Sequence, residues 1–150
     1  LTVQAESANP DIQALLLLFS TEDLGGVPHK FDGITINVAL MRPESRGFLK
    51  AKNANNSEAP DIQPKYLEAK KDRDTLVAGM QEIRKIMRKP ALQEIILSEY
   101  SPSSEVESNE QCLDFIRDRA RTSYHPVGTC KMGRDKMAVV DERLRVKKIF

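Results

Sequence analysis

The stretch of the chain with the most varied chemistry runs from 124 to 133, Tyr-His-Pro-Val-Gly-Thr-Cys-Lys-Met-Gly. The imidazole of His125 is a side chain of the type that can take a proton from a ligand and return it. Pro126 restricts the residue before it to extended backbone. Gly128 and Gly133 allow tight or left-handed turns and a close approach by a ligand. The pattern predicts a rigid loop that presents one imidazole.

Other chemistry is conceivable for the same stretch. A lone histidine beside Pro and Gly is, by itself, more often a structural hydrogen-bonding residue than a catalytic one. Cys130 has no base at a helpful spacing and is expected to pack rather than react. A zinc site would need His29, Cys112, His125 and Cys130, but His-x4-Cys without a paired Cys-x2-Cys is poor ligand spacing. We therefore predict no metal site, and an ordinary exposed His29 in a Gly-Pro loop.

Composition limits the class of protein. The chain has 150 residues, enough for one domain, and 23 basic against 22 acidic residues give a net charge of +1. Such a balance offers no electrostatic reason for binding nucleic acid or an anionic membrane. The longest apolar run, 14–19, is too short to span a bilayer. None of the seven glycines forms a Gly-x-Gly-x-x-Gly fingerprint or a Walker loop.

The elements that must position the loop can be predicted from hydrophobic periodicity. Residues 34–41 and 47–52 alternate between apolar and polar residues, and we expect them to form an antiparallel pair. A leucine run at 12–19 is typical of a buried strand. The segment 98–107 is expected to be an exposed linker or lid. These strands predict one antiparallel sheet.

Helices are expected near 73–88, 91–97 and 108–121. The first has an apolar stripe that we expect to face the sheet, with Asp72 or Asp74 as its cap and Arg84 in solvent (stripe: Leu76, Met80, Ile83, Met87). Pro90 suits the first turn of the second helix. Ser108 and Gln111 form a capping box at the third, whose apolar face includes Cys112 as a small buried hydrophobe. The predicted fold class is α+β, an antiparallel sheet covered by helices.

Three segments of the sequence together resemble a known family. The stretch 124–133, followed by Val-Val-Asp at 139–141, is similar to the C-terminal, substrate-side region of the glucose–methanol–choline (GMC) oxidoreductases, which include choline dehydrogenase. Pro-Glu-Ser-Arg-Gly at 43–47 is similar to that family's Pro-x-Ser-Arg-Gly segment. Asp-Ile-Gln-Pro-Lys-Tyr-Leu at 61–67 resembles another of its stretches. The resemblance covers about 41–146.

The resemblance implies an FAD-dependent enzyme that oxidises small alcohols. His125 would be the general base that removes the hydroxyl proton while hydride passes to FAD, and Tyr124, Val127, Gly128 and Thr129 would shape the loop against the cofactor. Residues 1–150 would be the GMC C-terminal domain, incomplete at its own C-terminal end. The N-terminal Rossmann-like domain that holds most of the FAD would lie outside this chain, which by itself would be inactive. The alternative is a non-catalytic truncated or partner-binding fragment that keeps the fold.

Overall fold

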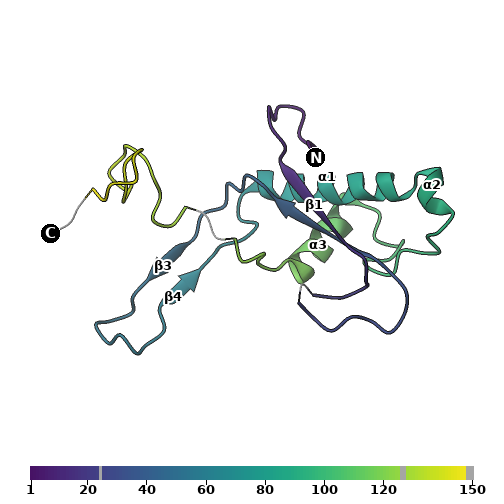
Figure 1. Cartoon of the computed structure of the whole chain (residues 1–150), viewed down its shortest axis with the longest axis horizontal. Coiled ribbons are helices and arrows are strands. Elements are labelled where there is room, and N and C mark those ends of the chain that lie inside the picture. Colours follow the sequence, from purple (N-terminus) through teal and green to yellow (C-terminus); the bar gives the residue numbers. More distant parts are fainter. Residues whose placement is uncertain (24, 126–127, 148–150) are drawn as a thin grey trace. The chain divides into compact units, whose positions relative to one another are not determined.

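The structure is a computed structural model that describes residues 1–23, 25–125 and 128–147 (Figure 1). The chain forms two compact units, residues 1–120 and 121–150, which are treated separately. The first unit holds every named helix and strand, in the order β1, β2, β3, β4, α1, α2, α3. The predicted α+β class, with antiparallel sheets and helices, is confirmed.

The strands β1 (Ile12–Leu17) and β2 (Thr35–Leu40) form an antiparallel pair in which Ile12 lies opposite Leu40. Both strands were predicted, and alternation in β2 was the signal for the second. The expected burial of the first strand is wrong for most of its length. Ile12 is buried, but Leu15 and Leu16 are 46% and 53% exposed, because a sheet of only two strands leaves much of its surface uncovered.

The strands β3 (Phe48–Lys50) and β4 (Asp61–Gln63) form a second antiparallel pair. The predicted pairing of 34–41 with 47–52 is therefore wrong, since β3 pairs with β4. The backbone at Gly47 explains the closeness of this pairing: a Cβ there would lie 1.9 Å from the Gln63 carbonyl oxygen. Only glycine permits that approach.

Three helices follow the strands: α1 (Lys70–Met87), α2 (Pro90–Gln93) and α3 (Asn109–Arg119). The predicted helices all exist, the second shorter than expected, with Pro90 in its first turn as predicted. The capping box is also confirmed, because Ser108 Oγ accepts from the Gln111 N–H and the Gln111 side chain accepts from the Ser108 N–H. The expected cap of α1 is wrong: α1 begins after Ala69, which provides no side-chain cap.

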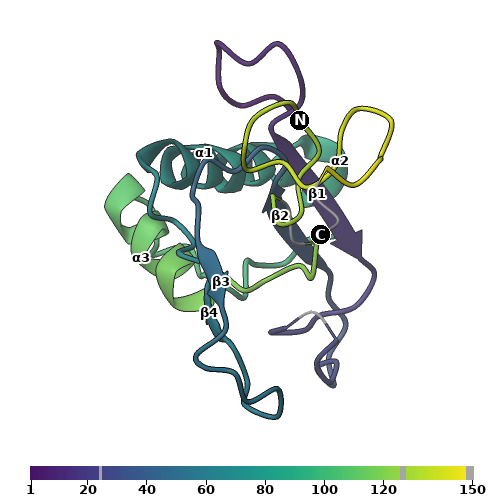
Figure 2. The same ribbon diagram turned by 90° about the vertical axis from the view of Figure 1, so that its left-hand side faces the viewer.

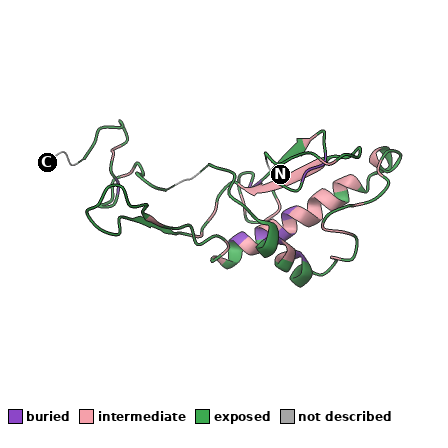
Figure 3. Ribbon diagram, turned by 90° about the horizontal axis from the view of Figure 1, so that it is seen from below, coloured by how far each residue is buried: buried purple, intermediate pink, exposed green. Residues whose placement is uncertain are grey.

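The core of the first unit lies around α1 (Figures 2 and 3). On one side, Gly79 lets α1 approach the first sheet so closely that a Cβ would meet Val38 and Ile12 at 2.9 and 3.1 Å. On another side, Val77 packs with Cys112 and Ile116 of α3. The burial predicted for Cys112 is confirmed. The predicted stripe is divided, with Leu76 and Met80 against α3 and Ile83 and Met87 along a groove beside the sheet.

Arg84 was expected in solvent, and this is wrong because its side chain is only 13% exposed. Its guanidinium donates to Glu99 Oε1 at 2.8 Å, to the Ser103 carbonyl at 3.0 Å, and to the Val106 carbonyl. Val106 in turn packs against the cluster shared by α1 and α3. The segment 98–107 is thus fastened to α1 and is not the free linker or lid that its polar composition predicts.

Candidate functional site

The segment predicted to carry chemistry lies in the second unit and has an unusual backbone. Tyr124, which precedes His125, and Cys130 both have left-handed backbone, with φ of 59° and 54°. Gly128 has φ of 92° and open space where a Cβ would be. This agrees with the left-handed backbone and open approach that the sequence predicted for this glycine. A left-handed conformation costs a residue other than glycine about 1–2 kcal/mol. Such conformations cluster at functional sites, where the surrounding structure maintains them.

The side chains of this segment face solvent. His125 is exposed and makes no hydrogen bond or ion pair to any residue in the described part of the chain. Thr129 and Cys130 are exposed, and Tyr124 is 79% exposed. The packing role expected for Cys130 is therefore wrong within this unit. Val127, the remaining residue predicted for the site, lies outside the described residues.

A short hydrogen-bonded turn region directly follows the segment and supports it structurally. Met132 forms an isolated parallel bridge with Val140, and Val140 forms an antiparallel one with Val146. Asp141 organises the end of this region: its carboxylate accepts from the Arg145 side chain and from the backbone N–H groups of Arg143 and Arg145. The Arg145 guanidinium and these two N–H groups hold the pKa of Asp141 below its ordinary value. Among the described residues after α3, these bridges are the β-structure, and no named strand is formed.

His29, the other histidine, is not the ordinary exposed residue predicted from its loop. Its side chain is 21% exposed, and Nδ1 lies 2.8 Å from Ser20 Oγ. The ring stacks on Phe31 with centroids 4.9 Å apart and meets Tyr100 edge-on at 5.2 Å. Glu22 lies 3.8 Å from Nε2 and also accepts from Arg119 at the end of α3. These contacts connect the loop after β1 to α3, which is a structural role.

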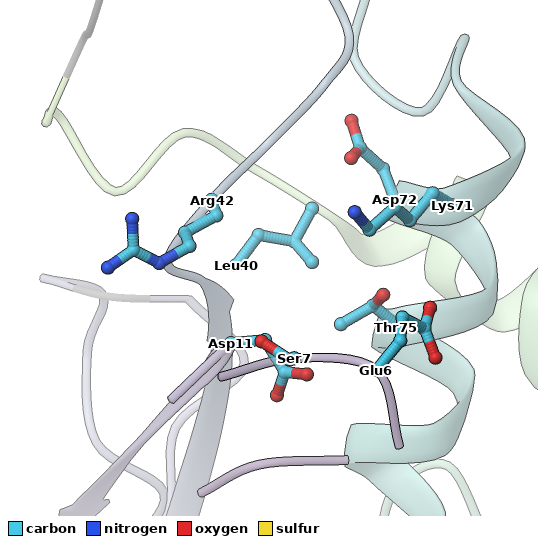
Figure 4. Close-up of a pocket in the computed structure, with 8 residues that line it drawn as sticks. All are labelled: Glu6, Ser7, Asp11, Leu40, Arg42, Lys71, Asp72 and Thr75. Atoms are coloured by element: carbon cyan, nitrogen blue, oxygen red, sulfur yellow. The ribbon is translucent and has the colours of Figure 1, made fainter. Parts of the chain in front are cut away.

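The small polar cavity in Figure 4, about 70 Å³, is a second place where charged groups gather. The carboxylate of Asp72 is almost fully buried and accepts from the backbone N–H groups of Glu44 and Ser45, both at 2.8 Å. Asp11 likewise accepts from the N–H groups of Val3 and Gln4, both at 2.9 Å. Lys71 pairs with Glu44 at 2.8 Å. Each carboxylate is held by two backbone donors, so the cavity serves as a structural junction.

Electrostatics support this interpretation of the cavity. Burial by itself raises the pKa of Asp72, but the hydrogen bonds from Glu44 and Ser45 outweigh it and hold the pKa below its ordinary value. Burial also raises the pKa of Asp11, but the hydrogen bonds from the N–H groups of Val3 and Gln4 outweigh it and hold the pKa below its ordinary value. Sequence reasoning missed both roles. The Pro-x-Ser-Arg-Gly segment signalled that 43–47 matters, but nothing local identifies Asp72 as its partner.

Neither a metal-binding cluster nor a membrane-spanning helix occurs in the described residues. No group of three or more His, Cys, Asp or Glu side chains within the described ranges is arranged to hold a metal ion. No helix in the same ranges is long and apolar enough to cross a membrane.

The chemistry open to the 124–133 segment is proton transfer. An imidazole that is exposed and makes no hydrogen bond within the described residues can accept a proton from a bound ligand, and Tyr124, Gly128 and Cys130 near it have left-handed backbone. No amino acid side chain can accept a hydride, so an oxidation at this site requires a cofactor. The described residues thus form an α+β fold and, in the second unit, a segment that carries an exposed histidine.

Comparison with known proteins identifies the family. The family model described as "GMC oxidoreductase", for the C-terminal domain, matches residues 43–149, more than half of the chain. The chain belongs to the GMC oxidoreductases. The resemblance based on the three segments is thereby confirmed.

Similar proteins include enzymes that act on alcohols. The chain is 36% identical to alcohol dehydrogenase [acceptor] from Pseudomonas putida, over 95% of this chain and 26% of that protein. It is 37% identical to oxygen-dependent choline dehydrogenase from Escherichia coli O127:H6, over 94% of this chain and 25% of that protein. The crystal structure of pyridoxine 4-oxidase from Mesorbium loti matches with a TM-score of 0.73 and 26% identity, over 93% of this chain and 28% of that one. The chain thus spans about a quarter of the length of these relatives.

Proposed function

We propose that the chain is the C-terminal part of an FAD-dependent alcohol dehydrogenase or oxidase, with His125 as its general base. The coarser statement, that the chain belongs to an alcohol oxidoreductase family, follows from the family match and the names of the relatives. The observation that best supports the role of His125 is its exposed imidazole, which makes no hydrogen bond or ion pair within the described residues and lies between the left-handed residues Tyr124 and Gly128.

The same loop fits a flat, uncharged group lying against it. Gly128 leaves open space beside the backbone, and the large uncharged side chains of Tyr124 and Met132 are 79% and 57% exposed. Exposed apolar surface of this kind is typical of a site that another group covers. FAD, when bound, would supply the acceptor for the hydride from the alcohol carbon. Tyr124, Gly128 and Thr129 are the described residues we propose to lie against it, together with Val127.

The role of His125 is to remove the proton that the alcohol must lose. Oxidation to an aldehyde breaks the O–H and C–H bonds, so one proton and one hydride leave the substrate. The imidazole accepts the proton from the hydroxyl oxygen, and the hydride leaves with both electrons of the C–H bond. The base must lie within hydrogen-bond reach of that hydroxyl, which an exposed loop side chain permits.

We further propose that a separate N-terminal domain provides most of the FAD site and that residues 1–150 alone neither hold flavin nor oxidise alcohols. This is consistent with the length of the relatives, about four times that of the chain. It is also consistent with the lack of a dinucleotide fingerprint among the seven glycines. The substrate class we propose is small primary or polyol alcohols, and the names of those relatives support alcohols in general and choline in particular.

The experiment compares the full-length protein with the chain of residues 1–150. We expect the full-length protein to show an oxidised flavin spectrum that bleaches anaerobically when one member of a panel of small alcohols, choline among them, is added. We expect the 1–150 chain to be colourless and inactive. A full-length protein without flavin, or one whose flavin no alcohol reduces, would contradict the proposal. A stoichiometric flavin in the 1–150 chain would contradict the division between domains.

A further inference from the structure

Thr122 lies three residues before His125 and makes a hydrogen bond to the backbone that leads to it. Thr122 Oγ1 accepts from the Tyr124 N–H at 3.0 Å. A hydroxyl that accepts from the N–H two residues later closes a side-chain turn, which takes the place of a backbone turn. The bond fixes the peptide plane between Ser123 and Tyr124. The hydroxyl of Thr122 thus determines how the chain approaches His125.

Tyr124 has a backbone conformation that the surrounding structure must maintain. Its φ is 59°, in the left-handed region, which is an outlier for a residue with a bulky side chain. Such conformations persist only where the flanking structure determines them. The ring of Tyr124 is 79% exposed, so packing of this side chain contributes little. The hydrogen bond to Thr122 instead fixes the chain on the N-terminal side of Tyr124.

The position of the His125 imidazole depends on this turn. Without the hydrogen bond, rotation about the backbone of Ser123 would move Tyr124 and His125 together. Consecutive Cα atoms are about 3.8 Å apart, so a modest rotation displaces the imidazole by an ångström or more. A base has to lie within hydrogen-bond reach of the proton that it removes. A misplacement of about 1 Å can lower a reaction rate by about a hundredfold.

We propose that Thr122 is a positioning residue for proton transfer at His125. Its hydroxyl oxygen holds the peptide plane before Tyr124 and thereby sets the direction in which the imidazole leaves the chain. This rests on the proposed function, in which His125 takes the hydroxyl proton of an alcohol. Thr122 itself moves no proton and touches no substrate. Its contribution comes from the acceptor oxygen, and the methyl group is dispensable.

Two substitutions at position 122 separate the acceptor oxygen from the shape of the side chain. Thr122→Val keeps the branched shape and removes the acceptor, whereas Thr122→Ser keeps the acceptor. In the full-length protein, we expect Thr122→Val to lower the limiting rate of alcohol-driven flavin reduction by about tenfold or more. The apparent Kd for the alcohol, the flavin content and the melting temperature should stay near the parent values. Thr122→Ser, and Ser123→Ala at the exposed neighbouring residue, should keep the parent rate.

A double variant distinguishes positioning of His125 from an independent effect. Because Thr122 acts through His125, Thr122→Val should cause little further loss of rate when His125 is already alanine. The loss in Thr122→Val alone should also be smaller at high pH, where solvent base replaces a misplaced imidazole. Losses that multiply in the double variant would overturn the proposal. A raised apparent Kd with an unchanged limiting rate would also overturn it, because the hydroxyl would then bind the substrate.

Amide hydrogen exchange provides a readout that needs no flavin. In the full-length protein, we expect the Tyr124 amide to exchange about tenfold faster in Thr122→Val than in the parent or in Thr122→Ser. Equal exchange in all three proteins would refute the turn, whatever the flavin does.

The proposed function and the role of Thr122 fail on different results. A His125→Ala protein that reduces its flavin at the parent rate would refute the role of His125, and that of Thr122 with it. A slow His125→Ala beside a Thr122→Val with the parent rate would refute the role of Thr122 alone.

Discussion

Replacing Asp72 with alanine tests the junction between the Pro-x-Ser-Arg-Gly segment and α1. The carboxylate of Asp72 is 2% exposed and accepts from the N–H groups of Glu44 and Ser45, both at 2.8 Å. Ser45 Oγ accepts in turn from the Ala69 N–H at 3.0 Å, just before α1 begins. Alanine at 72 would therefore leave two part-buried N–H groups without this acceptor and loosen the helix from the segment.

The magnitude follows from these contacts. An unsatisfied buried donor costs about 1–3 kcal/mol, so two donors give about 2–6 kcal/mol. A carboxylate in the first turn also interacts favourably with the helix dipole, by about 0.3–1 kcal/mol. Relaxation of the 43–46 segment toward water favours the lower part of the range, and we expect a loss of about 3 kcal/mol in the free energy of unfolding.

The assay is urea unfolding of the 1–150 chain followed by helical circular dichroism. The matched control is Asp74→Ala, two residues away on the same helix, where a half-exposed carboxylate pairs with Lys70. We expect that change to cost no more than about 0.5 kcal/mol. Equal losses for the two variants would refute the structural role of Asp72.

The pH dependence provides a second signature of Asp72. Burial opposes ionisation, but the hydrogen bonds from Glu44 and Ser45 prevail, and the pKa of the folded carboxyl lies below its ordinary value. A group with a lowered folded pKa stabilises the protein above its unfolded pKa, about pH 4, and this contribution disappears as pH falls through the folded pKa. Asp72→Asn should flatten the fall in stability below about pH 4. An unchanged acid profile would contradict the assignment.

Two further substitutions test other parts of the fold. Gly47→Ala places a Cβ 1.9 Å from the Gln63 carbonyl oxygen, so β3 and β4 must separate. The Phe48–Lys50 amides should then exchange faster with solvent. Unchanged exchange would show that the two strands approach less closely than described. Arg84→Ala removes the donors to Ser103 and Val106 and should lower the free energy of unfolding by about 2 kcal/mol, whereas exposed Arg88→Ala should cost under about 0.5 kcal/mol. Similar losses of unfolding free energy for the two variants in urea would refute the role of Arg84 in holding the segment 98–107 to α1.

The elements best predicted from sequence are those whose signals are local. Ser108 and Gln111 lie three residues apart, and their capping box forms as the pattern predicts. The alternation in β2 and the apolar periodicity of α1 likewise depend on neighbouring residues, and both elements are present. The family resemblance also depends on local patterns, in 43–47, 61–67 and 124–133, and it is confirmed.

The features that sequence reasoning missed depend on partners far along the chain. Asp72 was expected to cap its own helix, but its acceptor oxygens are used by backbone groups 27 and 28 residues earlier. Arg84 has the spacing of an exposed residue. Its contacts with residues 15 to 22 positions later show that it holds the segment 98–107 to α1. The pairing of β3 with β4 depends on a carbonyl contact at Gly47 that no periodicity indicates. His29 is half-buried in part because Tyr100, in the segment 98–107, packs edge-on against its ring.

The central claim is that His125 removes the hydroxyl proton, and anaerobic stopped-flow measurement of flavin reduction in the full-length protein tests it most directly. His125→Ala should lower the alcohol-driven reduction rate by about a hundred- to ten-thousand-fold, the usual contribution of a positioned base. Flavin content and melting temperature should stay near the parent values, and Arg134→Ala, an exposed change in the same unit, should leave the rate unchanged. The loss in His125→Ala should be smaller at high pH, where solvent base takes over part of the role. A His125→Ala protein that reduces its flavin at the parent rate would contradict the claim.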